Sequence, residues 1–291
     1  MRKPTALLLV LLTLTLYFVR PDVSHAVSSY EISDGSVRAL WSLENTTDDS
    51  GNGYTLTNNN TVDFVAGKLN NAASTTRALT QYLDIASDIG ITGGSVGIAL
   101  WVKINAQPAE GNGGGNPNNY WLFQQGDDGV DVNYAIVYWD NAGTYYVDFN
   151  RGRDGVADCN TTITQTLTTG TYFHIILNYD SGTQVVTPYI NGVAKTTATS
   201  CTGNGTGSNN EIVTIGAWKR SGTTPYTLTT ANYDEVVVLN RPFTSDEISG
   251  MYNGGTGAEV CITVGCGTPA PAAQITRCIR GIGISRQCTS R

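Results

Sequence analysis

The clearest hydrophobic pattern in the chain lies near its C-terminal end, where an apolar run precedes a short amphipathic segment. Glu235–Leu239 contains three consecutive valines, which is typical of a strand covered on both faces. Pro242 then ends the strand, because proline cannot donate to a ladder. Thr244 and Glu247 have capping-box spacing, and Gly254 stands where a left-handed helix terminus is expected. The pattern predicts a buried strand followed by one helix of two turns.

The segments upstream alternate between apolar and polar residues with the period of a β-strand. Val37–Leu43 reads as an opening strand, and Ser95–Ile104 reads as a central strand with Trp101 on one face. The opposite face of that central strand carries Val96, Ile98, Leu100 and Val102. Further strands are expected at Tyr134–Trp139 and Thr144–Asn150, which a tight hairpin joins.

Two stretches are too polar to form strands and are predicted to be exposed loops. Asn105–Asn119 is rich in Gly, Asn and Pro, and Ser200–Asn210 is rich in Gly and Asn. Because binding residues often lie on loops held by a rigid scaffold, both loops are candidate contact surfaces.

Many short strands cannot bury their apolar faces in one open sheet, and no period of 20–50 residues indicates a repeat fold. The pattern therefore predicts an all-β fold, a two-sheet antiparallel β-sandwich or jelly roll with one short C-terminal helix. We expect a single domain over residues 27–257. Residues 258–291 differ in composition and read as a small disulfide-stapled or extended tail.

Three stretches also resemble a known family. The closing segment Asp234–Ile248, the opening segment Leu40–Tyr54 and the central pair Tyr172–Gly182 and Pro188–Ala194 are similar to laminin-G-like and concanavalin A-like jelly-roll domains, in the family's order. The resemblance implies a jelly roll of the lectin and glucanase type. It does not imply one function, because one fold hosts many activities.

The charge and the N-terminus limit the classes of partner. A net charge of −7 with no basic cluster argues against nucleic acid, whose phosphates need a basic face.

Residues 1–26 have a basic start, an apolar stretch and Ser24-His-Ala26, which is the pattern of a secretory signal peptide. An uncleaved anchor is the alternative, but the apolar stretch is shorter than the ~20 residues of a membrane span. We therefore expect a secreted or cell-surface protein whose mature chain has no membrane span.

Export would place the six cysteines in an oxidising compartment, where disulfides are the expected state. Cys159 and Cys201 lie within the predicted sandwich, and we expect them to pair with each other. The tail has four cysteines, Cys261, Cys266, Cys278 and Cys288. Four cysteines allow three pairings, and the sequence leaves the choice open.

A structural calcium ion is a further expectation. Asp49, Asn52 and Asp234 offer hard oxygen ligands of the kind that Ca²⁺ prefers. In the family that the chain resembles, the opening turn and the closing strand often approach each other around such an ion. The alternative is that Asp49 and Asn52 only bond their own turn and that Asp234 only caps a strand.

Catalysis is not predicted. A glycosidase needs two carboxylates about 5–10 Å apart, and the related glucanases carry them in a Glu-x-Asp-x-x-Glu pattern that this chain lacks. His174 is the sole histidine after the signal segment, and its position on a strand favours a satisfied core residue over a catalytic base.

Aromatic side chains near strand ends are the best candidates for ligand contact, because their faces can stack on sugars. Among several such residues we single out Trp139, Tyr145 and Trp218. Packing within the sheets is the alternative for each of them. The sequence thus predicts a secreted, non-catalytic module that binds a glycan or an extracellular protein through the loops at the edge of the sandwich, around Asn105–Asn119 and Ser200–Asn210. The rivals are an extracellular glycoside hydrolase and a structural adhesion module.

Overall fold

The computed structural model describes residues 28–85, 87–91, 94–110, 118–127, 131–152, 159–195, 199–200, 212–219, 224–263, 277–279 and 287–289. The predicted signal peptide, Cys201, residues 201–210 and most of the tail lie outside the described residues, as do residues 111–117 of the first predicted loop.

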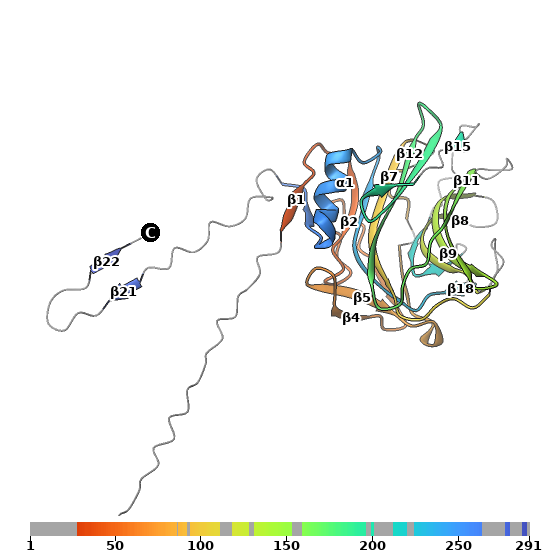
Figure 1. Cartoon of the computed structure of the whole chain (residues 1–291), viewed down its shortest axis with the longest axis horizontal. Coiled ribbons are helices and arrows are strands. Elements are labelled where there is room, and N and C mark those ends of the chain that lie inside the picture. Colours follow the sequence, from red (N-terminus) through yellow and green to blue (C-terminus); the bar gives the residue numbers. More distant parts are fainter. Residues whose placement is uncertain are drawn as a thin grey trace, which may run out of the picture.

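The described strands form two large sheets that face each other (Figure 1). The first has seven strands in the order β11-β10-β9-β8-β16-β6-β3. Its strands are β3 (Thr57–Asn59), β6 (Tyr82–Ile85), β8 (Tyr120–Asp127), β9 (Asp131–Asn141), β10 (Thr144–Arg151), β11 (Cys159–Thr164) and β16 (Val213–Ile215). All pairings in this sheet are antiparallel.

The second sheet has nine strands in the order β14-β13-β12-β7-β19-β5-β4, with β15 beside β13 and β2 beside β19. Its strands are β2 (Val37–Trp41), β4 (Asp63–Ala66), β5 (Asn71–Thr75), β7 (Val96–Ile104), β12 (Tyr172–Asp180), β13 (Val185–Ile190), β14 (Val193–Ala194), β15 (Thr199–Ser200) and β19 (Ala231–Leu239). Its pairings are also antiparallel. The predicted antiparallel β-sandwich is confirmed.

Shorter elements complete the described chain. Two short strand pairs are antiparallel, β17 (Ala217–Trp218) with β18 (Thr227–Leu228) and β21 (Arg277–Ile279) with β22 (Gln287–Thr289). The helical elements are α1 (Ser245–Tyr252), η1 (Arg77–Leu79) and η2 (Asn253–Gly255). No helix in the described part of the chain has the length and apolar character needed to cross a membrane.

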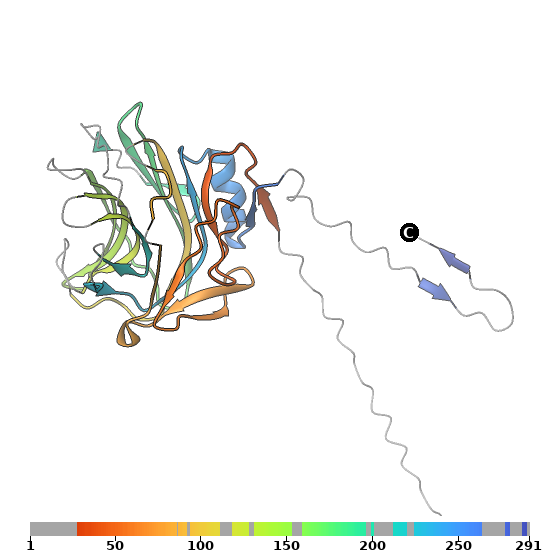
Figure 2. The same cartoon turned by 180° about the vertical axis from the view of Figure 1, so that it is seen from behind.

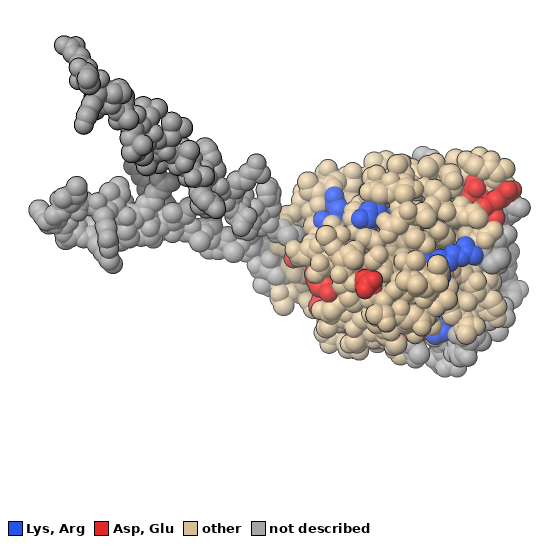
Figure 3. Space-filling model, turned by 90° about the horizontal axis from the view of Figure 1, so that it is seen from below, with Lys and Arg blue, Asp and Glu red and all other residues tan. Residues whose placement is uncertain are grey.

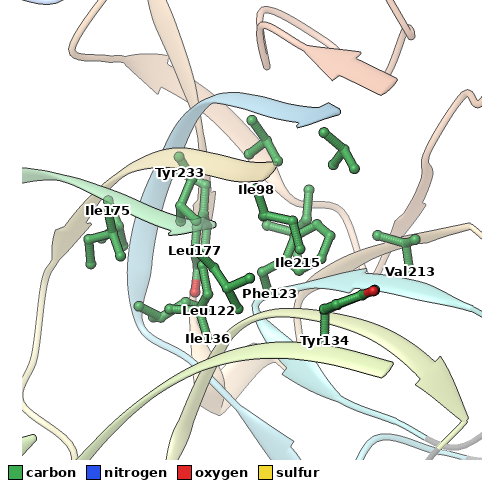
Figure 4. Close-up of a cluster of buried hydrophobic side chains, with 14 of the residues drawn as sticks. Ile98, Leu122, Phe123, Tyr134, Ile136, Ile175, Leu177, Val213, Ile215 and Tyr233 are labelled. Atoms are coloured by element: carbon green, nitrogen blue, oxygen red, sulfur yellow. The ribbon is translucent and has the colours of Figure 1, made fainter. Parts of the chain in front are cut away.

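The main hydrophobic core fills the space between the two large sheets. Figure 4 shows Leu122 and Ile136 from the seven-stranded sheet facing Ile175 and Leu177 from the nine-stranded sheet. The four apolar residues predicted for one face of β7 all belong to this core, and Trp101 lies outside it. Side-chain alternation in the sequence therefore identified the buried face of the central strand correctly.

A second core covers the outer face of the nine-stranded sheet. Val236 and Val238 of β19 join the main core, whereas Val237 and Leu239 join the second core with Ile248 of α1. Figures 1 and 2 both show α1 and β1 on the side of this sheet away from the seven-stranded sheet. Every residue of β19 is buried, as the run of valines predicted.

The helix boundaries follow the predicted capping chemistry at one end. The Thr244 side chain accepts from the Glu247 N–H, and the Glu247 carboxylate accepts from the Thr244 N–H, which completes the capping box. At the other end the left-handed cap is Asn253 with φ 46°, one residue before the predicted Gly254. Asparagine tolerates this conformation, and Gly254 follows with φ 60°.

The domain continues past the expected boundary at residue 257. β1 (Ser29–Glu31) pairs in parallel with β20 (Glu259–Cys261), and Val260 is buried in the second core. The first and last described segments of the sandwich therefore lie side by side, on the face opposite the seven-stranded sheet (Figure 1).

Candidate functional site

The outward face of the seven-stranded sheet carries an apolar cluster of its own. On β9, Ile136 and Tyr138 point into the main core, and the alternate residues Val137 and Trp139 point outward. Trp121 of β8 pairs with Val137 across the ladder and joins the same outward cluster. The cluster lies on the side of the sandwich away from α1.

Aromatic rings extend this cluster into a row that we call the aromatic patch, made of Trp121, Trp139, Tyr146, Trp218 and Tyr226. Trp139 stacks on Tyr146 with ring centroids 4.5 Å apart, because the two residues are register partners in the β9–β10 hairpin. Trp218 stacks on Trp121 at 5.2 Å and meets Tyr226 at 5.1 Å. Trp121 is 7% exposed, whereas Tyr226 is 48% exposed. The patch thus has a buried floor and an accessible rim.

The β17–β18 pair forms a flap that brings Trp218 and Tyr226 to the patch. Gly216, with φ 85°, lets the chain turn out of β16 immediately before the flap. A Cβ at this position would also lie 3.1 Å from the Thr229 hydroxyl and 3.2 Å from a Thr75 methyl. The indole N–H groups of Trp121 and Trp218 meet no acceptor among the described residues.

Polar side chains lie beside the aromatic patch on β10 and β11. Asp148 pairs with both Val137 and Thr162 in the ladder, so its side chain lies on the outward face next to the cluster. Burial raises the pKa of the Asp148 carboxyl, and the Thr162 hydroxyl lowers it in part. Within the described part of the chain, Oδ1 of Asp148 and Oδ1 of Asn150 have no hydrogen-bond partner. The site therefore has polar side chains on the strands beside the stacked rings.

The face shown in Figure 3 has isolated acidic and basic side chains among mostly uncharged residues. Near the patch, the Lys219 ammonium contacts the Asp84 carboxylate at 2.5 Å, and the Asn59 amide donates to the other oxygen of Asp84. That carboxylate is consequently already paired within the protein.

The structure brings together two of the three aromatic residues predicted to contact ligand. Trp139 and Trp218 both belong to the aromatic patch. Tyr145 lies on the core side of β10, where it packs on the main core and stacks on Tyr138 at 5.7 Å. Its neighbour Tyr146 takes the outward position instead. Adjacent residues on a strand face opposite ways, so the hairpin register decides which tyrosine reaches the patch.

Two of the predicted calcium ligands hold the opening turn. The exposed Asp49 carboxylate accepts from the Ser42 hydroxyl at 2.6 Å, and the Asn52 amide donates to the carbonyls of Val37 and Arg38. Both residues therefore bond β2 and Ser42, outside their own turn, and their role as calcium ligands stays a prediction.

The third predicted ligand, Asp234, is fully buried on β19. Its Oδ2 accepts from the N–H groups of Lys68 and Leu69 at 2.7 and 2.9 Å, and its Oδ1 has no hydrogen-bond partner among the described residues. Burial raises the pKa of the Asp234 carboxyl to about 8, and the two N–H groups offset part of that shift. A Cβ at Gly67 would lie 2.5 Å from Oδ2, so this close contact needs glycine.

Asp234 and its neighbour Glu235 each lie near other carboxylates. Asp49 and Asp234 both add to the pKa of Glu235, which burial raises well above its ordinary value. Glu44 adds to the pKa of Asp234. The described residues nevertheless contain no group of three His, Cys, Asp or Glu side chains placed to share a metal ion. A calcium ion would therefore depend on Asp234 Oδ1, Asn52, Asp49 and backbone carbonyls, and its presence stays a prediction.

The cysteine and histidine predictions have different outcomes. Cys159 is buried at the start of β11, but Cys201 lies outside the described residues, so their pairing stays a prediction. His174 is 2% exposed and packs against Trp101, with ring centroids 4.8 Å apart and the ring planes tilted by 32°. Burial lowers the pKa of His174 to about 3, so the imidazole is neutral at physiological pH. It is a core residue, although Nδ1 finds no partner among the described residues.

The geometry defines a two-sheet β-sandwich with an outward aromatic patch on one sheet. Residues 74–249 match a laminin-G-type model described as the concanavalin A-like lectin/glucanases superfamily. The match covers more than half of the chain, and this chain belongs to that superfamily. No curated protein matches its sequence.

Solved structures share the fold at low sequence identity. The binding domain of Paraclostridial Mosquitocidal Protein 1 is similar with a TM-score of 0.58 and 14% identity, covering 76% of this chain and 52% of that one. The binding domain of Botulinum Neurotoxin DC, in complex with SialylT, has a TM-score of 0.56 and 11% identity, covering 75% and 51%. This chain spans about half the length of those two domains.

A third structure is matched over almost its whole length. Domain 4 of AbnA, a GH43 extracellular arabinanase from Geobacillus stearothermophilus, in complex with arabinotriose, has a TM-score of 0.53 and 18% identity, with 76% of this chain and 98% of that chain covered. At these identities the three structures show the common fold and do not transfer a function.

Proposed function

We propose that this chain is an extracellular, non-catalytic module that binds a glycan on the aromatic patch. The observation that carries the proposal is the row of stacked rings on one outward face, beside the polar side chains of Asp148 and Asn150 on the same face. Sugar rings present apolar C–H faces that stack on aromatic rings, and their hydroxyls donate to carboxylate and amide oxygens. A site with both features suits a hydroxyl-rich ligand.

The proposed absence of catalysis is supported by the spacing of Asp148 and Asp84, two carboxylates of this face whose side chains the structure describes. Asp148 is on β10 and Asp84 is on β6, four strands apart in the sheet order. At about 4.8 Å per strand they are roughly 19 Å apart, beyond the 5–10 Å that a glycosidase pair spans. Asp84 is also paired with Lys219. The similarity to two toxin binding domains agrees with a binding role.

A structural calcium ion is part of the proposal. The buried Oδ1 of Asp234, which has no hydrogen-bond partner among the described residues, and the nearby Glu44 carboxylate support this proposal, since a divalent ion stabilises the ionised carboxylate. The ion would hold the opening turn against β19, and it would take no part in ligand contact. Asp49 and Asn52 would supply oxygens from that turn.

A glycan array probed with the purified mature chain, with calcium and with chelator, tests the binding role. We expect retention on one class of glycan, without release of sugar from the bound material. Sugar release would favour the hydrolase alternative. No retained glycan, together with binding to an extracellular protein, would favour a protein-binding module instead.

A further inference from the structure

Gln124 is a fully buried polar residue beneath the flap that carries Trp218. It lies on β8 between Thr214 of β16 and Ala135 of β9, with 0% of its surface exposed. A β-bulge between Trp121 and Phe123 puts both Trp121 and Gln124 on the outward side of the strand. A buried carboxamide is costly unless its donors and acceptor are all used.

The side chain of Gln124 bonds the backbone of the flap through both its amide nitrogen and its amide oxygen. Its Nε2 donates to the Lys219 carbonyl at 2.8 Å, and its Oε1 accepts from the Lys219 N–H at 3.0 Å. Nε2 also donates to the Gly126 carbonyl at 2.8 Å. The carboxamide thus makes the same pair of hydrogen bonds to Lys219 that a neighbouring strand would make.

β17 and β18 pair with each other and not with the seven-stranded sheet, so side-chain contacts hold the flap. Tyr82 of β6 packs on Ala217 and Leu228, the Lys219 ammonium contacts Asp84, and Gln124 bonds the Lys219 backbone. Trp218 directly precedes Lys219, so fixing the Lys219 peptide groups also fixes the Trp218 ring over Trp121. The Thr214 hydroxyl also donates to the Ala217 carbonyl at 2.7 Å. This hydrogen bond holds the start of the flap and not Trp218. The two hydrogen bonds from Gln124 to Lys219 lie next to Trp218 in the chain, so they constrain the Trp218 ring more directly.

We infer that Gln124 is the positioning residue that holds Trp218 on Trp121 and thereby keeps the aromatic patch assembled. Gln124 itself is buried and does not touch ligand. Its contribution to affinity rests on the proposed glycan-binding function, but its effect on the tryptophan pair does not.

The test uses the exciton couplet that two stacked indoles give in circular dichroism, measured on the full-length protein. Gln124→Leu removes both hydrogen bonds to Lys219 while keeping the volume nearly unchanged. Gln107→Leu is the matched control, because the Gln107 amide bonds the Leu167 carbonyl and accepts from the Tyr138 hydroxyl, away from the flap. Trp218→Phe removes one indole of the Trp121–Trp218 pair and so gives the spectrum expected when the couplet is absent.

We expect Gln124→Leu to lose most of the couplet, as Trp218→Phe does, and Gln107→Leu to keep it. A couplet of wild-type size in a folded Gln124→Leu protein would overturn the inference.

Gln124→Glu provides a second test if Gln124→Leu does not fold. A protonated glutamic acid can still donate to the Lys219 carbonyl and accept from its N–H, whereas the carboxylate cannot donate. The couplet should be present at low pH and lost as the introduced carboxyl ionises, and a pH-independent couplet would contradict the inference. These readouts need no ligand. If Gln124→Leu loses the couplet but the wild-type protein binds no glycan, the proposed function is rejected and the positioning role of Gln124 stands.

Discussion

Trp218 lies flat against Trp121, with ring centroids 5.2 Å apart and an angle of 11° between the ring planes. The two residues belong to different sheets, so the stack joins the flap to the main sandwich. Such pairs contribute about 0.5–1.5 kcal/mol beyond the area they bury. The surface that we propose for glycan binding is therefore assembled before ligand arrives, which reduces the ordering cost of binding.

The buried Asp234 predicts a pH dependence of folding stability. Its pKa is about 8 in the folded protein and near 3.8 when exposed, so the folded form holds the proton more tightly. The stabilisation is present below pH 4 and is lost as the pH rises towards 8, on the order of a few kcal/mol. In chelator, we expect the wild type to melt at lower temperature at pH 8 than at pH 5.

Asp234→Asn is the control for this pH dependence. The asparagine Oδ1 can still accept from the N–H groups of Lys68 and Leu69, but the side chain no longer ionises. The melting temperature of this variant should change less between pH 5 and pH 8. Glu235 keeps its own dependence, since its pKa is also raised. An identical pH profile in both proteins would show that Asp234 does not control the effect.

Calcium should stabilise the folded protein at the high pH at which ionisation of Asp234 destabilises it. If the ion binds Asp234, it favours the ionised carboxylate, and the melting temperature should rise on addition of calcium, more at pH 8 than at pH 5. Asp234→Asn should lose most of this increase. Calorimetric melting at pH 8 that is the same with calcium and with chelator would remove the ion from the proposal.

The pairing of Cys159 with Cys201 can be examined by peptide mapping of unreduced protein. We expect one disulfide-linked peptide that contains both residues. The closed loop should contribute about 3–5 kcal/mol in the loop-entropy model, so changing both cysteines to serine should lower the midpoint of denaturant unfolding. A peptide linking Cys159 to a tail cysteine would show that the predicted pairing is wrong.

The sequence predicted the fold well because the sandwich depends on local patterns. Alternation identified the buried face of β7, and the valine run of β19 indicated burial on both sides. The capping box at Thr244 and Glu247 depends on residues three positions apart, which the sequence shows directly. The exact end of the helix was missed by one residue, since Asn253 and Gly254 both tolerate a positive φ.

The site was predictable only in part, because it depends on register and on contacts between distant segments. The choice between Tyr145 and Tyr146 follows from the pairing of Trp139 with Tyr146 across the hairpin, which depends on the exact register of the two strands. The bulge after Trp121, which turns Gln124 outward, leaves no clear signal in the sequence. The contact between Gln124 and Lys219 joins residues 95 positions apart.

The most direct test of the central claim compares dissociation constants for a glycan that the wild type retains on the array. Trp218→Ala should weaken binding at least about tenfold, equivalent to ~1.4 kcal/mol, because it removes a ring from the rim of the patch. Val193→Ala, which alters an exposed apolar residue on the nine-stranded sheet, should bind like the wild type. Unchanged affinity in a folded Trp218→Ala protein would contradict glycan binding on the aromatic patch.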